Sequence, residues 1–408
     1  MSNLAKVLSI VFLLTVTSIY AGSFFSTSSK GIGVKRYAVS VRGLGMGGTG
    51  LASTDSIALA NYSISKWRTI NDTRATVGIQ YLRFDTKLND INFTTSTSNI
   101  GDLHLAIPLK SHKLLMGISI TPYSNVDFKY IMTVQDQGKT YDESVFQKGS
   151  ISKAQFAIIW SPISNIGISL NGNYYFGTIK DQYRLRFNNS NYYDSYHEIE
   201  YQIKGPGLGL SLDLQAARKL LFAGFIDLKP SIDLIRNMNS ALSLAETEIT
   251  NAASFPIHFG IGSSYKIHPR LNISVDYSRQ NWSEGFGIEQ LQSAGLDPLT
   301  NSRLDDWYQL GVGIERNARI SRNRKFLDRV DFRTGFSIRG LGYRFNNEPV
   351  LQYAGHFGLG IPFSHSNRFD FAIIVGIRGD KSKNLAEERF VNFEVSVTMG
   401  ELWFQKLR

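Results

Sequence analysis

Apolar and polar residues alternate strictly in several segments of this chain, with a period of two. The clearest example is "LNISVDYS", where the apolar side chains of residues 271, 273, 275 and 277 would share one face and the polar ones the other. The same pattern recurs at 102–109, 208–214 and 391–399. Alternation of this length predicts β-strands with one apolar and one polar face.

The connections between these segments fall into two kinds. Short turns are predicted at 110–113, 161–164, 215–219, 267–270, 318–327 and 364–368. Long polar loops are predicted at 85–100, 123–150, 177–203, 230–254, 281–306, 339–354 and 379–389. The two kinds alternate and divide the chain into fourteen strands, which begin near 74, 101, 114, 151, 165, 204, 220, 255, 271, 307, 328, 355, 369 and 390. Segments 126–134 and 181–187 also resemble strands. We interpret them as hairpins within outward loops, whereas counting them in the wall would give sixteen strands.

Alternating short and long connections are typical of transmembrane β-barrels, which close so that no strand edge is left unpaired in lipid. We therefore predict an all-β fold, a transmembrane antiparallel β-barrel of about 14 strands with apolar residues outside and polar residues inside. The alternative, a secreted β-sandwich or propeller, explains the strands but not the regular connections. Aromatic residues near strand ends would form interfacial girdles: Trp160, Tyr174, Tyr175, Phe176, Tyr277, Trp282, Trp307, Tyr308, Trp403 and Phe404.

The N-terminal 21 residues have the layout of a secretory signal peptide, with Lys6, a short apolar core and small residues around Ala21 and Gly22. A transmembrane anchor is the alternative, but an apolar core of about 15 residues is short for a span. We expect export to the outer membrane, a mature chain that begins near Gly22 and periplasmic termini. The chain has no cysteine, so disulfides and thiolate metal sites are excluded.

The net charge of +10 is spread along the chain. Because no basic block is interleaved with stacking aromatic residues, nucleic acid is not an expected partner. Anionic outer-membrane lipid and lipopolysaccharide are the expected partners of such a charge in the envelope.

The stretch "RGLGMGGTG" contains Gly-x-Gly-x-x-Gly at Gly43, Gly45 and Gly48, the spacing of a dinucleotide-binding turn. That turn must follow a strand and open a helix in a βαβ unit, whereas here the next alternating segment begins only near residue 74. We therefore predict close packing inside the barrel, where glycine lets the backbone bend and approach the wall. Met46 would add an adaptable apolar contact there.

The segment "RGLGMGGTGLASTDSIALANYS" (42–63) resembles the N-terminal region of FadL-like outer-membrane proteins, a superfamily that includes long-chain fatty-acid transporters and PorV-type proteins. The usual Pro-Ala after the Asn is replaced by Tyr62 and Ser63. The resemblance implies a fourteen-stranded barrel with an N-terminal hatch in its lumen. We accordingly expect a signal peptide at 1–21, a hatch at 22–72, the barrel at 73–400 and a periplasmic tail at 401–408. The expected hatch motif comprises Arg42, Gly43, Gly45, Met46, Gly47, Gly48, Gly50, Asp55 and Asn61.

Motifs of catalysis are missing from the sequence. There is no Gly-x-Ser-x-Gly elbow and no His-Glu-x-x-His, and the seven histidines are scattered, which favours roles in turns or as lumen filler. A Ser–His–polar constellation on neighbouring strands stays open, because Ser and Asn are abundant. We predict no enzyme, cofactor or metal. The acidic pairs at 305–306 and 387–388 are expected on solvated outer loops, where a divalent bridge to lipopolysaccharide is the alternative.

Two functions fit this sequence. The first is transport of hydrophobic small molecules, such as fatty acids or hydrocarbons, across the outer membrane, with apolar residues of loops 230–254 and 281–306 either capturing the substrate or capping the barrel. The second is a PorV-like, non-enzymatic role with protein partners in secretion or envelope assembly. The polar inward-facing residues speak against an apolar channel, and the long polar loops and the tail "ELWFQKLR" favour protein partners.

Overall fold

The computed structural model describes residues 22–26, 32–53, 55–88, 91–136, 139–187, 192–240, 243–284, 303–319, 325–364 and 366–401. The expected signal peptide, most of the C-terminal tail with its two aromatic residues, and the central part of loop 281–306 lie outside these ranges. Within these ranges no helix is long and apolar enough to cross a bilayer.

The described chain is almost entirely β-structure. Its strands are β1 (Val34–Lys35), β2 (Thr73–Leu88), β3 (Ile91–Lys110), β4 (Leu114–Asp136), β5 (Lys139–Ile163), β6 (Ile166–Phe187), β7 (Ser195–Ala217), β8 (Leu220–Asp227), β9 (Ile232–Ser240), β10 (Ser243–Ala253), β11 (His258–His268), β12 (Leu271–Gln280), β13 (Arg303–Arg316), β14 (Asp331–Phe345), β15 (Glu348–Pro362), β16 (Arg368–Arg378) and β17 (Ala386–Glu401). The short helices are η1 (Phe24–Ser26), α2 (Val41–Leu44), η2 (Ile64–Thr69), η3 (Trp282–Glu284), η5 (Phe326–Arg329) and α4 (Lys381–Asn384).

The sheet closes on itself because the last strand pairs with the first strand of the wall. β17 and β2 are antiparallel in unbroken register, from Ala386 opposite Leu88 to Glu401 opposite Thr73. β8 and β9 both pair with β7 and form two halves of one wall strand, and β10 and β11 form the next. The wall in the described residues therefore has fourteen strands, which confirms the predicted count over the alternative of sixteen.

Polar residues point inward and apolar residues outward along the wall, as predicted. On β17, Phe393 is 39% exposed while Glu394 is 1% exposed. On β12, Val275 is exposed whereas Ser274 and Asp276 are buried. This polarity matches a barrel with lipid outside and a polar interior.

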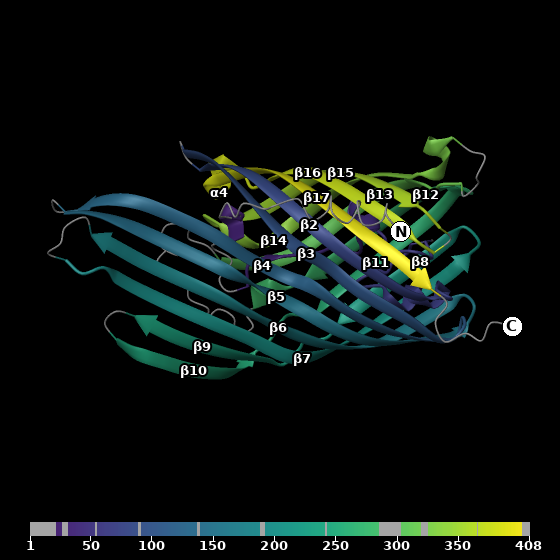
Figure 1. The fold of residues 1–408 in the computed structure, drawn as a ribbon, viewed down its shortest axis with the longest axis horizontal. Helices are drawn as coiled ribbons and strands as arrows, with labels where there is room; N and C mark the ends of the chain where they lie inside the picture. The colour runs from purple at the N-terminus through teal and green to yellow at the C-terminus, as the bar shows by residue number, and fades with distance from the viewer. Residues whose placement is uncertain are drawn as a thin grey trace, which may run out of the picture.

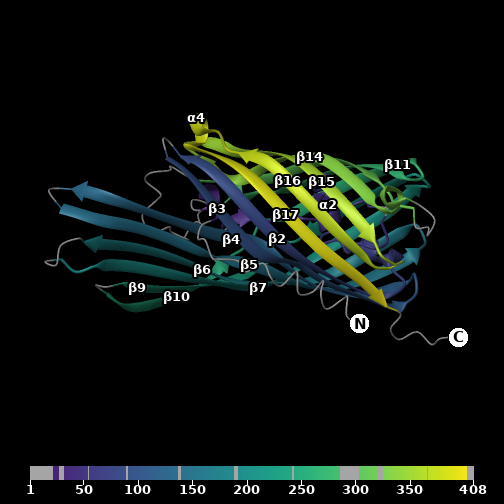
Figure 2. The same ribbon diagram turned by 45° about the horizontal axis from the view of Figure 1, so that its top comes forward.

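The long loops of the sequence prediction were wrong in most places. The stretches 85–100, 123–150, 177–203 and 230–254 mainly continue the strands on either side, and the segment at 339–354 is a hairpin with a tight turn at Asn346 and Asn347. In Figures 1 and 2 the ends of β4, β5, β6, β7, β9 and β10 reach well beyond the other strands. We call this projecting part the extension. Away from an apolar belt a sheet still needs backbone pairing but not strict alternation, so the alternation pattern did not reveal it.

The interfacial assignment of three aromatic residues was also wrong. Tyr175, Trp282 and Trp307 are buried in the barrel interior, at most 3% exposed, whereas Trp160 is 53% exposed. Glu388, expected on a solvated loop, is fully buried on β17. Large amphipathic rings fit both an interface and a packed polar interior, so their position along a strand does not decide between the two.

Barrel closure can be tested by a cross-link between β2 and β17. Thr76 and Thr398 are register partners whose hydroxyl groups are 2.9 Å apart, a spacing compatible with disulfide geometry. Because the chain has no cysteine, T76C/T398C should form one intramolecular disulfide on oxidation, seen as a reducible gel shift and by mass spectrometry. The pair T76C/S119C should form none, because Ser119 lies on β4, two strands away from β2 across His104 of β3, beyond the reach of a disulfide. No cross-link in T76C/T398C would contradict closure.

Candidate functional site

The glycine motif lies against the inner surface of the wall. Gly47 and Gly48 have φ of 75° and 74°, the left-handed region that favours glycine. A Cβ on Gly47 would lie 2.5 Å from the carbonyl oxygen of Val312 on β13 and 2.7 Å from that of Phe336 on β14. The glycines therefore serve a close backbone approach to the wall.

Arg42, the first residue of the motif, joins the N-terminal segment to the wall through an ion pair. Its Nε donates to Oε1 of Glu315 on β13 at 2.8 Å, and its Nη2 contacts the other carboxylate oxygen. Its Nη1 donates to the Ser53 hydroxyl. Because both partners are at most 3% exposed, the pair is buried and geometrically demanding.

The pair is part of a network of alternating charges across the lumen. Arg333 on β14 contacts Glu315 at 2.9 Å and Asp370 at 2.6 Å. Arg368 on β16 contacts Asp370 at 2.9 Å and Asp55 at 2.5 Å. Burial raises the pKa of the Asp55 carboxyl, but the guanidinium groups of Arg368 and Arg42 outweigh burial and hold that pKa well below its ordinary value.

The remaining motif residues are also held in place. The Asn61 side chain donates to the carbonyl of Ala38 at 2.6 Å, Gly50 N donates to the carboxylate of Asp276 at 2.6 Å, and Met46 is 1% exposed. Tyr62, which stands where the family has Pro, stacks on Tyr37 at 4.9 Å between ring centroids. The residues of the motif therefore lie together in one region of the barrel interior. Sequence reasoning did not identify their partners on the wall, which are Asp276, Glu315, Arg333 and Arg368.

Several histidines lie in the two kinds of place that were predicted for them, the barrel interior and the turns. His104, His258 and His356 are buried in the interior, and His112 has φ of 56° in a tight turn. His258 Nε2 is 2.8 Å from the Ser278 hydroxyl and His356 Nε2 is 2.8 Å from the Ser337 hydroxyl. Both serines are 1% exposed, so these pairs are enclosed structural contacts. No cluster of three or more potential metal ligands occurs in the described ranges.

The wall is interrupted between β3 and β4. These strands pair only from Leu103 opposite Ile120 to Lys110 opposite Leu114, although β3 continues along β2 to Ile91 and β4 continues along β5 to Asp136. We call the stretch in which they do not pair the seam; it comprises residues 91–102 of β3 and 121–136 of β4.

The N-terminal segment occupies part of the seam. β1 pairs with β4 through Val34 opposite Asn125 and Lys35 opposite Ser124. Gly22 N donates to the carbonyl of Asp127 on β4 at 2.7 Å, and the Gly22 carbonyl accepts from the Thr95 hydroxyl of β3 at 2.9 Å. Gly22 therefore bridges the two separated strands.

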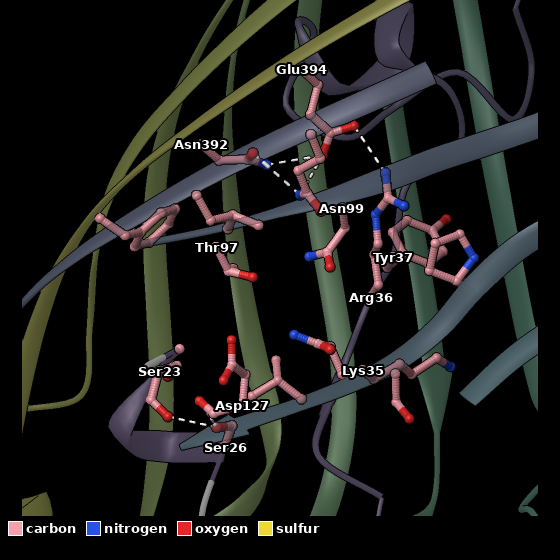
Figure 3. Close-up of a pocket in the computed structure, with 18 of the residues that line it drawn as sticks. Ser23, Ser26, Lys35, Arg36, Tyr37, Thr97, Asn99, Asp127, Asn392 and Glu394 are labelled. Carbon is pink, nitrogen blue, oxygen red and sulfur yellow. Dashed lines mark hydrogen bonds and ion pairs between the residues drawn. The ribbon is translucent and has the colours of Figure 1, made fainter. Parts of the chain in front are cut away.

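A cavity of about 410 Å³ lies behind the seam (Figure 3). Its lining is mixed: Leu44, Leu82, Phe84, Ile374 and Phe390 supply apolar surface, and Ser23, Arg36, Asn99, Asp127, Arg339, Gln352, Arg378, Asn392 and Glu394 are among its polar residues. The four consecutive residues 97–100 of β3 all line it. Because successive side chains of a strand point to opposite faces, the cavity extends around the edge of β3 toward the outside of the barrel.

Comparison with known protein families agrees with this architecture. A family model described as BamG matches residues 4–408. The chain belongs to the BamG family. No curated protein sequence matches the chain significantly.

Solved structures place this BamG-family chain in the FadL-like fold and confirm the resemblance. The "Pseudomonas aeruginosa FadL homologue" is 10% identical with a TM-score of 0.61, covering 90% of this chain and 99% of that one. The P. putida "toluene transporter TodX" is 12% identical with a TM-score of 0.58 at 90% and 99% coverage. The Ralstonia pickettii "toluene transporter TbuX" is 14% identical with a TM-score of 0.57 at 89% and 98% coverage. At these identities the similarity concerns the fold.

The close approach of the motif to the wall of this BamG-family barrel can be tested at Gly47. Gly47→Ala should destabilise the fold by about 2 kcal/mol or more, because the added Cβ meets backbone oxygens and the φ is positive. The measurement is a heating series: samples are incubated at increasing temperatures and run on gels without boiling, and the temperature at which the band of the folded form disappears is compared. Gly172→Ala is the matched control, since the nearest atom that its Cβ would meet is the carbonyl oxygen of Phe156, at 4.0 Å. Equal stability of both variants would refute the packing role.

The Arg42–Glu315 pair should matter far more than an exposed pair of the same type. Arg42→Met leaves a buried carboxylate with one partner fewer, so we expect a loss of about 3 kcal/mol and faster protease cleavage within the N-terminal segment. Arg83→Met removes a pair whose side chains are 53% and 52% exposed and should cost at most about 1 kcal/mol. Protease sensitivity that is unchanged in Arg42→Met would show that the pair does not hold the segment.

Proposed function

We propose that this protein is an outer-membrane barrel that exchanges hydrophobic or amphipathic small molecules with the bilayer through the seam between β3 and β4. The observation that carries the proposal is the cavity at the seam, which reaches around the edge of β3 at residues 97–100. Ile100 at this edge is 69% exposed, as expected of a residue that meets lipid acyl chains. Fatty acids and hydrocarbons are suitable candidate cargo.

The lumen favours this lateral route over passage along the barrel axis. The ion pairs of Arg42, Glu315, Arg333 and Arg368 with their partners fill the space between the N-terminal segment and β13–β16. A hydrophobic molecule would have to separate these buried charges to pass, at a cost of several kcal/mol. Residues 22–72 would then act as a hatch that closes the axial path, with both termini in the periplasm.

A second function, a non-enzymatic role with protein partners in secretion or envelope assembly, is favoured by the extension. Six neighbouring strands project beyond the rest of the wall. A transporter of small molecules does not need such a broad sheet, whereas a protein partner would find there exposed aromatic residues such as Tyr193, between β6 and β7, and Tyr196 on β7.

The seam route can be tested by locking β1 to β4. Val34 and Asn125 are register partners at a spacing that a disulfide can bridge. Oxidised V34C/N125C should take up a fluorescent fatty acid or a hydrophobic dye into liposomes several-fold more slowly than the reduced form. The single variant V34C should be insensitive to oxidation, and uptake that is the same in locked and reduced protein would sink the seam route.

The two functions can be separated by shortening the hairpin of β4 and β5 through deletion of 129–146. The transport function expects unchanged dye uptake in this variant, because the cavity lining lies outside the deletion. The partner function expects reduced levels of other outer-membrane proteins in cells that carry it. Normal levels of those proteins would count against the second function.

A further inference from the structure

Arg339 presents an unsatisfied positive charge to the seam cavity. Its Nε donates to the side-chain oxygen of Gln309 at 2.8 Å and its Nη2 to the carbonyl of Tyr37 at 3.3 Å. Both acceptors are neutral, and Arg339 has no carboxylate within ion-pair distance among the residues that the structure describes. No hydrogen bond of its Nη1 is found among those residues, and Arg339 lines the cavity.

Two further guanidinium groups line the same cavity. Arg36 forms ion pairs with Glu394 at 3.0 Å and with Asp102 at 3.6 Å, and its Nε is buried without a hydrogen bond. Arg378 donates to Gln352, lies 3.6 Å from the Glu388 carboxylate, and stacks against the rings of Phe84 and Phe390 at 5.0 and 5.1 Å from their centroids. Arg36 and Arg378 thus have carboxylate partners, whereas Arg339 has none among the described residues. An anion placed between the three guanidinium groups would be attracted by all of them.

Neutral hydrogen-bonding groups complete the polar lining. The Ser124 hydroxyl is fully buried and has no partner. Asn99 points toward the open space in Figure 3, beside Thr97. Buried polar groups without partners are costly, so this side of the cavity fits a ligand that carries several acceptor oxygens.

The other side of the cavity is apolar and faces the seam. Leu82, Phe84, Ile374 and Phe390 form this surface, and the exposed Ile100 continues it onto the outside of the barrel. An acyl chain could therefore lie in the seam while its headgroup stays among the guanidinium groups. The arrangement requires a molecule that is charged at one end and apolar at the other.

We propose that the seam cavity binds the headgroup of a phosphate-bearing lipid, with Arg339 as the principal contact and the acyl chain leaving between β3 and β4. The inference rests on the proposed lateral function and names its ligand class. A phosphate group offers several acceptor oxygens to Arg339, Arg36 and Arg378 at once. A carboxylate offers two, and a hydrocarbon offers none and would leave every donor unpaired.

Three probes built from the same oleoyl chain test the ligand class: dioleoyl phosphatidic acid and dioleoylglycerol, which carry two chains and differ in the phosphate, and oleic acid, a single chain with a carboxylate. Each is titrated into the full-length purified barrel, and binding is followed by native mass spectrometry. We expect the phosphatidic acid to bind at least tenfold more tightly than oleic acid and dioleoylglycerol not to bind at the site. Equal binding of phosphatidic acid and oleic acid would overturn the phosphate assignment, as would equal binding of phosphatidic acid and dioleoylglycerol.

Variants of Arg339 test the position of the site. Arg339→Met should weaken phosphatidic acid binding at least tenfold, and Arg339→Lys should restore part of the affinity because it keeps the charge. Arg389→Met removes an exposed arginine from β17 and should have no effect. Gel mobility of the unheated proteins reports whether each variant folds.

A second variant keeps the test decisive if Arg339→Met fails to fold. Asn99→Trp fills the cavity from the edge of β3 and removes no side-chain hydrogen bond that the structure contains, so it should also abolish phosphatidic acid binding. Unchanged binding in either folded variant would overturn the site. Seam-dependent dye uptake without phosphatidic acid binding would overturn only this inference, whereas phosphatidic acid binding with uptake indifferent to the seam lock would overturn only the proposed function.

Discussion

The need to satisfy every backbone N–H and C=O group within a bilayer determines the rest of this structure. Pairing of β17 with β2 meets that need around the circumference. The exception is the seam, where the residues of β3 before Leu103 and the residues of β4 after Ile120 do not pair with each other. There the N-terminal segment supplies substitute partners, with β1 along β4 and Gly22 between Asp127 and Thr95. The position of the N-terminal segment is consequently linked to the backbone pairing of the wall, because the segment pairs where β3 and β4 do not.

The position of the N-terminal segment in turn explains the polar interior. A polypeptide inside a barrel brings its own donors and acceptors, and the inward-facing wall residues must match them. Asp276 accepts from the backbone at Gly50, Glu315 pairs with Arg42, and Arg368 pairs with Asp55. Wall glycines complete the match, because Gly313 and Gly335 contact the backbone at Met46 and Gly47. The polar inner face of the wall is thus complementary to the N-terminal segment that packs against it.

The sequence was sufficient to predict the features that lipid imposes on side chains. Alternation at 271–278 and 391–399 predicted strands and the direction in which their side chains face, because one face of each strand must be apolar along the membrane. The order of the connections predicted the strand number. It did not predict the extension, where pairing continues without that requirement. It also did not predict the seam, because β1 has only two residues and backbone pairing leaves no side-chain pattern.

In the candidate site, too, the sequence predicted some features and not others. The glycines at 45–48 were recognisable because a positive φ and close approach demand glycine. Their wall partners were not recognisable, since pairing Arg42 with Glu315 requires knowledge of which strands lie side by side. A usable signal was nevertheless present: single charged residues at inward positions of otherwise alternating strands, such as Asp276, Glu315 and Glu394. Each of them contacts the N-terminal segment.

The distribution of charge within the barrel separates a structural region from the region that we propose binds a ligand. Around Arg42 and Arg333 every cation contacts carboxylates, so that region is electrostatically complete and resists rearrangement. Around Arg339 the cation contacts only neutral oxygens, and an open volume adjoins it at the seam. The proposed exchange with the surroundings therefore lies at the side of the barrel, where the backbone pairing is interrupted and a bound anion would balance the charge of Arg339.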